Sequence, residues 1–124
     1  MKALVIDDDD IARELIVSVL ESGGYETYDL PSPIGATQVI LDRGIELVVL
    51  DLFMPAMSGD KLAKMLRSNP RLHALTIVLV SSCDIAQLEG LANSVRADAV
   101  VPKQEIRARL LREVNGSFRR AAAR

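Results

Sequence analysis

Short apolar runs alternate with longer amphipathic stretches along all 124 residues of the chain. Five short segments are rich in apolar or β-branched residues and are predicted to be strands: 3–6, 25–30, 45–53, 75–80 and 97–101. The third is apolar without alternation from Leu47 to Leu50, which is typical of a strand covered on both faces. The second, YETYDL, alternates weakly and is expected nearer an edge of the sheet.

Between these strands, apolar residues recur at the three- and four-residue spacing of helices that bury one face. The first helix is expected from Ile11 to Gly23–Gly24, and the second is expected to be capped by Ser32, with Pro33 as its first residue, Ile34 on its apolar side and Gly44 at its end. The third is expected from about Ser58 to Arg67 and ended by Asn69–Pro70, and the fourth is expected to be capped by Asp84. The fifth has an apolar stripe formed by Ile106, Leu110, Val114 and Phe118. Gly116 favours an early end of the last helix.

Five strand–helix units in succession predict an α/β fold with a parallel sheet and helices on both faces, because each crossover between parallel strands is right-handed. We expect one domain over residues 1–118. The remaining residues, 119–124, read RRAAAR and are expected to be a small basic C-terminal tail.

Composition narrows the possible partners and compartments. Hydrophobic residues make up 49% and aromatic residues 3%, so the core is expected to be aliphatic. The net charge of −2 lacks the excess of positive charge that is typical of proteins that bind nucleic acids directly. The single cysteine, Cys83, excludes an internal disulfide and fits a reducing cytoplasm. No stretch approaches the roughly 18 apolar residues of a membrane span, so we expect a cytoplasmic protein without membrane contact.

Chemically active residues follow the strands. In open α/β sheets the functional sites lie beyond the carboxyl ends of the strands. There the first strand delivers Asp7–Asp10, the third Asp51, the fourth Ser81 and Ser82, and the fifth Lys103. Acids from two strands, a hydroxyl and an ammonium are therefore expected at one edge.

Asp7, Asp8 and Asp51 would repel one another unless a hard cation joined them. Magnesium suits carboxylate ligands, and a carboxylate beside it can attack phosphorus. Asp51, on the central strand, is the expected nucleophile, with Asp7 and Asp8 as metal ligands. The loop after the first strand has no glycine to cradle a phosphate, which argues against a flavin or dinucleotide site.

Simpler interpretations exist for each of these residues. The run of four aspartates, taken alone, is a solvated acidic turn in which Asp10 caps or starts a helix. Lys103 can be an ordinary surface lysine, and Ser82 is interpreted as structural. Cys83 has no neighbouring base, and His73, the only histidine, is expected at the surface, so neither is taken as catalytic.

Four motifs resemble the receiver domain of bacterial two-component response regulators, of the chemotaxis-regulator type: VIDDD (5–9), LVVLDLFMPAMSG (47–59), IVLVSS (77–82) and VPK (101–103). The resemblance implies a flavodoxin-like, doubly wound five-stranded sheet in the order 2-1-3-4-5. It implies that Asp51 is the phosphoacceptor. It also implies that Asp7, Asp8 and the backbone carbonyl of Phe53 join Asp51 in holding Mg²⁺ (or Mn²⁺).

The resemblance further implies that Ser81 and Lys103 bind the phosphoryl group and that a sensor histidine kinase or phosphotransfer protein supplies it. Such a domain is a signalling switch and not an enzyme, beyond its own phosphotransfer and dephosphorylation. A downstream partner, an output domain or a second copy is expected on the face of the fourth helix, fifth strand and fifth helix.

Three positions depart from the receiver pattern. Gln104 follows Lys103 where receivers usually have a proline in a cis bond, so we expect a trans bond and a reshaped loop. Val100 occupies the usually aromatic switch position, and Ser82 replaces an alanine. The chemistry at Asp51 is expected to be intact, while the usual coupling between Ser81 and the switch residue cannot run in its normal form.

Two alternatives remain open. The chain can be a receiver-fold interaction module whose phosphorylation is silent. It can also be a phosphatase of the haloacid-dehalogenase type, with Asp7 as nucleophile and Asp9 as acid and base. The second leaves Asp51 unexplained and lacks an obvious cap.

Overall fold

The computed structural model describes residues 1–82, 86, 90 and 93–122. Five strands form one parallel sheet: β1 (Lys2–Ile6), β2 (Glu26–Leu30), β3 (Leu47–Asp51), β4 (Thr76–Ser81) and β5 (Ala99–Pro102). Their order is β2-β1-β3-β4-β5, so the predicted flavodoxin-like topology is confirmed. The weakly alternating β2 lies at an edge, as its sequence indicated.

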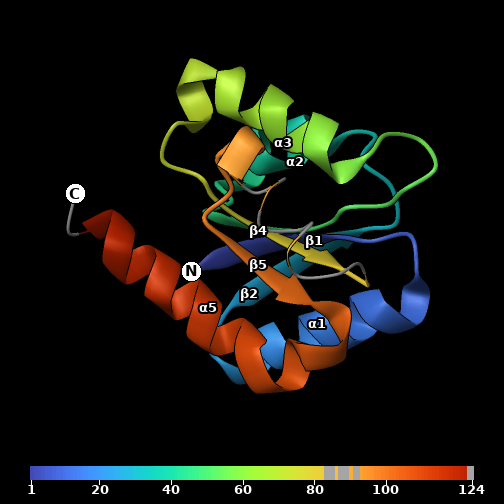
Figure 1. Ribbon diagram of the computed structural model, residues 1–124. Coiled ribbons are helices and arrows are strands. Elements are labelled where there is room, and N and C mark those ends of the chain that lie inside the picture. Colours follow the sequence, from blue (N-terminus) through green and yellow to red (C-terminus); the bar gives the residue numbers. More distant parts are fainter. Residues whose placement is uncertain (83–85, 87–89, 91–92, 123–124) are drawn as a thin grey trace.

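Helices cover both faces of the sheet (Figure 1). One layer contains α1 (Asp10–Ser22) and α5 (Ile106–Ala122), and the other contains α2 (Ala36–Arg43) and α3 (Gly59–Ser68). Two short 3-10 helices, η1 (Pro70–Leu72) and η2 (Lys103–Glu105), precede β4 and follow β5. The predicted helix cap at Asp84, and Cys83 beside it, lie outside the described residues.

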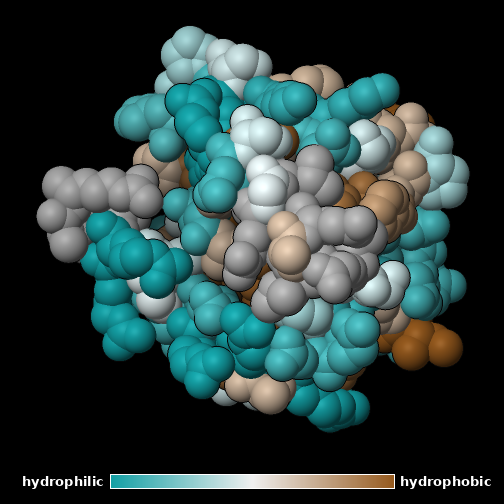
Figure 2. All heavy atoms as spheres, viewed as in Figure 1, coloured by the Kyte–Doolittle hydropathy of each residue, from teal (hydrophilic) through white to brown (hydrophobic). Residues whose placement is uncertain are grey.

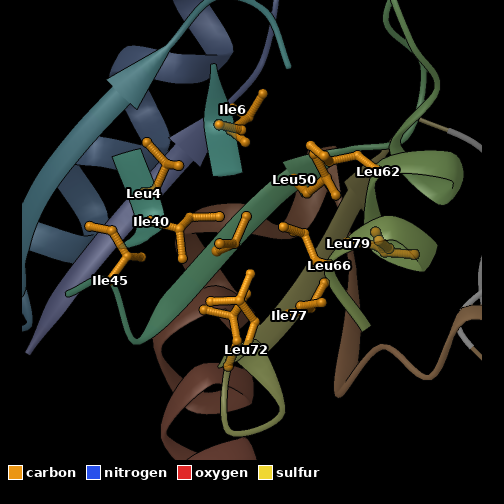
Figure 3. Packing of buried hydrophobic residues seen from close by; sticks show 14 of the residues in the cluster. Leu4, Ile6, Ile40, Ile45, Leu50, Leu62, Leu66, Leu72, Ile77 and Leu79 are labelled. Carbon is orange, nitrogen blue, oxygen red and sulfur yellow. The ribbon is translucent and has the colours of Figure 1, made fainter. Parts of the chain in front are cut away.

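Two aliphatic clusters hold the layers together. Figure 3 shows Leu4, Ile40, Leu50, Leu66 and Ile77 converging between the sheet and the α2–α3 layer. The opposite face packs against the α1–α5 layer through residues such as Ile16, Val49 and Leu110, all fully buried. Neighbouring residues of β3 belong to different clusters, which explains why its sequence is apolar without alternation.

The start of the second helix was predicted wrongly. Pro33 accepts a backbone hydrogen bond from Ala36 at 3.1 Å, and the Ser32 hydroxyl accepts one from the Ile34 amide at 3.1 Å. These bonds form a turn, and Gly35 takes a left-handed φ of 83° before the helix begins at Ala36. Ile34 is consequently 77% exposed and does not join the core.

The last helix runs through Gly116 to Ala122, so the early end predicted at this glycine is wrong. Val114 and Ser117 on either side of it are buried, and the Phe118 ring stacks on Tyr25 with centroids 6.5 Å apart. Packing thus offsets the roughly 1 kcal/mol that a helical glycine costs. No helix in the described part of the chain is both long and apolar enough to span a membrane.

A mostly buried arginine, Arg67, whose side chain is 12% exposed, connects the amino ends of β4 and β5 to α3. The Arg67 guanidinium donates to the Leu75 carbonyl at 2.6 Å, the Arg96 carbonyl at 2.9 Å and the Asp98 carboxylate at 2.7 Å. Asp98 also accepts from the Ile77 amide at 2.8 Å. This cluster stabilises the end of the sheet opposite to the acidic residues. Among the residues that carry a hydropathy colour in Figure 2, hydrophilic ones predominate on the face shown.

Candidate functional site

The carboxyl ends of four strands bring the sequence-predicted residues to one edge of the sheet. Asp7 directly follows β1, Asp51 ends β3, Ser81 ends β4 and Lys103 directly follows β5. In the parallel register Asp51 lies opposite Val80, and Ser81 lies opposite Pro102. The lysine thus reaches the site from the second strand beyond Asp51.

Three carboxylates converge at this edge. Asp7, Asp8 and Asp51 each offer an oxygen, and these oxygens all lie within 4.8 Å of one another. Asp7 and Asp51 are buried, whereas Asp8 is exposed. The Lys103 ammonium lies 2.9 Å from Asp7 Oδ2 and 3.4 Å from Asp51 Oδ1, so it supplies a counter-charge to both buried acids.

The four consecutive aspartates have different environments. Asp7 Oδ1 accepts a hydrogen bond from the Asp9 amide at 2.9 Å. Asp9 is the N-cap of α1, and its carboxylate accepts from the Ile11 amide at 3.0 Å. Asp10 is the first residue of the helix, where its charge favours the helix dipole. Only Asp7 and Asp8 remain to face Asp51.

Sequence reasoning missed Arg13 and its partner Asp29. Arg13 donates to the backbone carbonyl of Asp7 and to the carboxylates of Asp10 and Asp29. The one signal in the sequence is the spacing of three residues between Asp10 and Arg13, which places the pair on one helix face. Nothing in the sequence places Asp29, at the end of β2, beside them.

The electrostatic environment of Asp51 favours its protonated form. Burial and the nearby charge of Asp7 raise the pKa of Asp51 to about 6, although Lys103 and a hydrogen bond from the Phe53 backbone act in the opposite direction. Burial by itself lowers the pKa of Lys103, but contacts with Asp7 and Asp51 outweigh it and raise this pKa above its usual value. Lys103 is therefore charged, and Asp51 is ionised above about pH 6.

The loop after β3 depends on a glycine. The Gly59 amide donates to the Leu52 carbonyl at 2.8 Å, which draws the start of α3 against the end of β3. A Cβ at Gly59 would overlap the backbone carbonyl oxygen of Asp51 and press on the Cα of Leu52. This close approach fixes the backbone on which the Asp51 carboxylate is mounted.

The remaining predicted residues surround this centre. Phe53 lies on the loop after Asp51 and is 57% exposed, and Ser81 is fully buried. Val100 is half-buried in β5 and packs against the cluster on the α2–α3 side. Gln104 lies in η2, and because the described residues contain no cis peptide bond, the predicted trans bond after Lys103 is confirmed.

The donor set fits a hard divalent cation. Asp7 Oδ2 is buried and accepts no hydrogen bond from the described residues. The Lys103 ammonium, 2.9 Å away, is the ion-pair partner of this oxygen. A buried carboxylate oxygen beside two further carboxylates, with no sulfur or imidazole in the cluster, suits magnesium or manganese.

Comparison with known proteins gives one consistent family. The model of the family described as "Response regulator receiver domain" matches residues 3–115, within the predicted domain 1–118. The phosphate regulon transcriptional regulatory protein PhoB of Pseudomonas aeruginosa is 33% identical over 79 residues, which are 64% of this chain and 34% of that protein. The chain thus spans about a third of the length of this relative.

Solved structures agree with the family match. The BeF3-activated N-terminal receiver domain of Klebsiella pneumoniae RstA is 26% identical and superimposes with a TM-score of 0.85 over 96% of this chain and 99% of that one. A sensor protein from Polaromonas sp. JS666 is 27% identical, with a TM-score of 0.85 over 97% of each chain. These matches favour the receiver interpretation over the phosphatase, and Asp9, the acid and base of the phosphatase hypothesis, instead caps α1.

Proposed function

Because the chain belongs to the response regulator receiver domain family, we propose that it acts as a signalling switch by accepting a phosphoryl group on Asp51. One observation carries this proposal: the Asp51 carboxylate ends the central strand, faces Asp7 and Asp8, and lies 3.4 Å from the Lys103 ammonium. This arrangement supports the proposed roles of Asp51 as nucleophile, of Asp7 and Asp8 as metal ligands and of Lys103 as a positive charge for the phosphoryl group.

In the proposed reaction an ionised oxygen of Asp51 attacks phosphorus, an acyl-phosphate bond forms, and the phosphorus–nitrogen bond of a phosphohistidine donor breaks. The electron pair leaves with the imidazole. Asp51 must be ionised to attack, so its pKa of about 6 leaves it active at neutral pH. Magnesium held by Asp7, Asp8, Asp51 and the Phe53 carbonyl would neutralise charge on the phosphoryl oxygens.

Lys103 and Ser81 would bind the transferred group. The Lys103 ammonium contacts two carboxylates, and phosphorylation of Asp51 would offer it a phosphoryl oxygen in place of the Asp51 carboxylate. The Ser81 hydroxyl, at the end of β4, would donate a hydrogen bond to the same group. Movement of Ser81 toward the phosphoryl group would then shift the population of conformations around β5.

The partners follow from this chemistry. We place the phosphodonor among sensor histidine kinases or phosphotransfer proteins of the cytoplasm. The face that the resemblance assigns to the downstream partner, an output domain or a second copy consists of β5, α5 and the predicted fourth helix, which lies largely outside the described residues. Beyond transfer to itself and loss of the phosphoryl group as phosphate, the domain would catalyse no reaction.

Intact-protein mass spectrometry after incubation with acetyl phosphate tests this proposal. The wild type is expected to gain one phosphoryl group in the presence of magnesium and none in its absence. Asp51→Asn should gain none, while Asp60→Asn, which removes an acid from the first turn of α3, should react like the wild type. An adduct that persists in Asp51→Asn would overturn the assignment of the acceptor.

A second function has one observation in its favour. Val100 is already packed against the core and offers no aromatic ring that could swing inward after phosphorylation. The chain can accordingly serve as an interaction module with a silent switch. Partner affinity that is identical for phosphorylated and unmodified protein would favour the module, and no adduct from a folded, magnesium-binding chain would do the same.

A further inference from the structure

Arg13 joins three elements beside the candidate metal site. Its guanidinium donates from Nη1 to the Asp7 backbone carbonyl at 2.8 Å, from Nη2 to Asp10 at 2.6 Å and from Nε to Asp29 at 2.9 Å. The side chain is only 14% exposed. The end of β1, the first turn of α1 and the end of β2 are thus held by one planar group.

These contacts fix the backbone that carries the two acids. The Asp7 amide donates to the Leu30 carbonyl at 3.2 Å, and the Asp7 carbonyl accepts from Arg13 at 2.8 Å. The peptide that links Asp7 to Asp8 therefore has its carbonyl held by Arg13, with one candidate ligand on each side. A shift of this carbonyl would move Asp8, the exposed member of the three acids.

Attraction by charge cannot explain why Arg13 lies beside a cation site. A guanidinium near a cation site repels the cation, and here Asp10 and Asp29 already neutralise it locally. If Arg13 acted through charge alone, its removal would strengthen magnesium binding. If it acts by holding the Asp7 carbonyl, its removal would weaken magnesium binding. The two roles predict changes of opposite sign.

We propose that Arg13 is a positioning residue for the divalent cation, fixing the β1–α1 connection so that Asp7 and Asp8 face Asp51. This inference rests on the proposed function, since it assumes that the three carboxylates bind magnesium. The planar guanidinium of Arg13 donates three hydrogen bonds in three directions, which the ammonium of a lysine cannot reproduce. A lysine at position 13, although it keeps the positive charge, should therefore not restore magnesium binding.

Isothermal titration of the purified chain with magnesium chloride tests the proposal. Arg13→Lys and Arg13→Gln should each weaken the Kd by about tenfold, the lower end of the range for groups that orient metal ligands. Asp29→Asn, which removes one anchor of the guanidinium from a half-exposed position, should weaken it in the same direction by a smaller factor. The exposed Arg107→Gln on α5 removes an equal charge and should leave the Kd unchanged.

Urea unfolding of each variant without metal separates positioning from general stability, because a purely structural role would lower stability and leave the Kd of the folded protein unchanged. A folded Arg13→Lys with the wild-type Kd, or an Arg13→Gln that binds more tightly, overturns the proposal. If the Arg13 variants do not fold, an unchanged Kd in Asp29→Asn overturns it instead. A wild type that binds no magnesium refutes the metal-dependent function itself, which is a different result from wild-type affinity in the variants.

Discussion

Neutralising Asp51 should stabilise the metal-free protein. Asp51 is 3% exposed, and its pKa rises from the usual 3.8 to about 6 because of burial and the charge of Asp7. The folded state thus holds the Asp51 proton more tightly than the unfolded state does. Between about pH 4 and pH 6 stability falls as pH rises, and above about pH 6 the penalty is complete.

The penalty can be worked out from this pKa change. A difference of one pKa unit corresponds to 1.36 kcal/mol, so the rise from 3.8 to about 6 costs about 3 kcal/mol at pH 7.5. At about pH 4.5 the folded carboxyl is mostly protonated and the cost falls to roughly 1 kcal/mol. Asp51→Asn keeps the shape of the side chain and removes its charge. Its free energy of unfolding should therefore exceed that of the wild type by about 3 kcal/mol at pH 7.5 and by roughly 1 kcal/mol at about pH 4.5.

Urea unfolding followed by circular dichroism, in EDTA at both pH values, measures the difference. Asp8→Asn is the matched control: this carboxylate is exposed, so its loss should change the metal-free stability by less than about 0.5 kcal/mol. Magnesium at about 100 times its Kd should then add about 2.7 kcal/mol to the wild type and little to Asp51→Asn. An Asp51→Asn protein no more stable than the wild type at pH 7.5, or a gain independent of pH, would refute the reasoning.

Three further predictions concern the loop after Asp51 and the opposite end of the sheet. Gly59→Ala should lower the free energy of unfolding by about 2–3 kcal/mol, because the added methyl meets the Asp51 backbone; a midpoint in urea equal to that of the wild type would contradict this. Phe53→Asn should shorten the lifetime of the phosphorylated protein, since the exposed ring would otherwise hinder attacking water, and equal rates of phosphate release would argue against it. Arg67→Met should cost about 3 kcal/mol, because it removes the guanidinium that pairs with Asp98 in a mostly buried ion pair whose side chains are 12% and 11% exposed; the exposed Arg107→Met is the control, and a loss as small as that of the control would exclude the role.

Much of the fold follows directly from the sequence. The continuously apolar segments around Leu50 and Leu79 predict strands covered on both faces, and parallel strands necessarily bring their carboxyl ends to one edge. That geometry alone places Asp7, Asp51 and Lys103 at the same edge of the sheet. The family motifs add the strand order, which local patterns do not contain.

The features that escaped prediction depend on tertiary contacts. The turn before α2 arises because Gly35 adopts a left-handed conformation that a Ser-Pro pattern does not reveal. The continuation of α5 past Gly116 depends on packing of Phe118 against Tyr25. The hydrogen bond from Arg13 to Asp29 joins residues that are 16 positions apart. The raised pKa of Asp51 depends on burial that only the folded chain provides.

The strand order also sets where the domain can open locally. β1, β3 and β4 each have two neighbours, whereas β5 is bonded to β4 alone, and it carries Val100 and leads directly into Lys103. Amides at such an edge exchange with solvent through smaller, cheaper fluctuations than those at the centre of a sheet. Asp7 and Asp51 are thus attached to the strands whose amides are most protected. Lys103, their positively charged partner, follows β5, an edge strand that can separate from the sheet more easily. Hydrogen exchange should show slow amides at Leu50 and faster ones at Val100, with detachment of β5 transiently removing the lysine from both carboxylates.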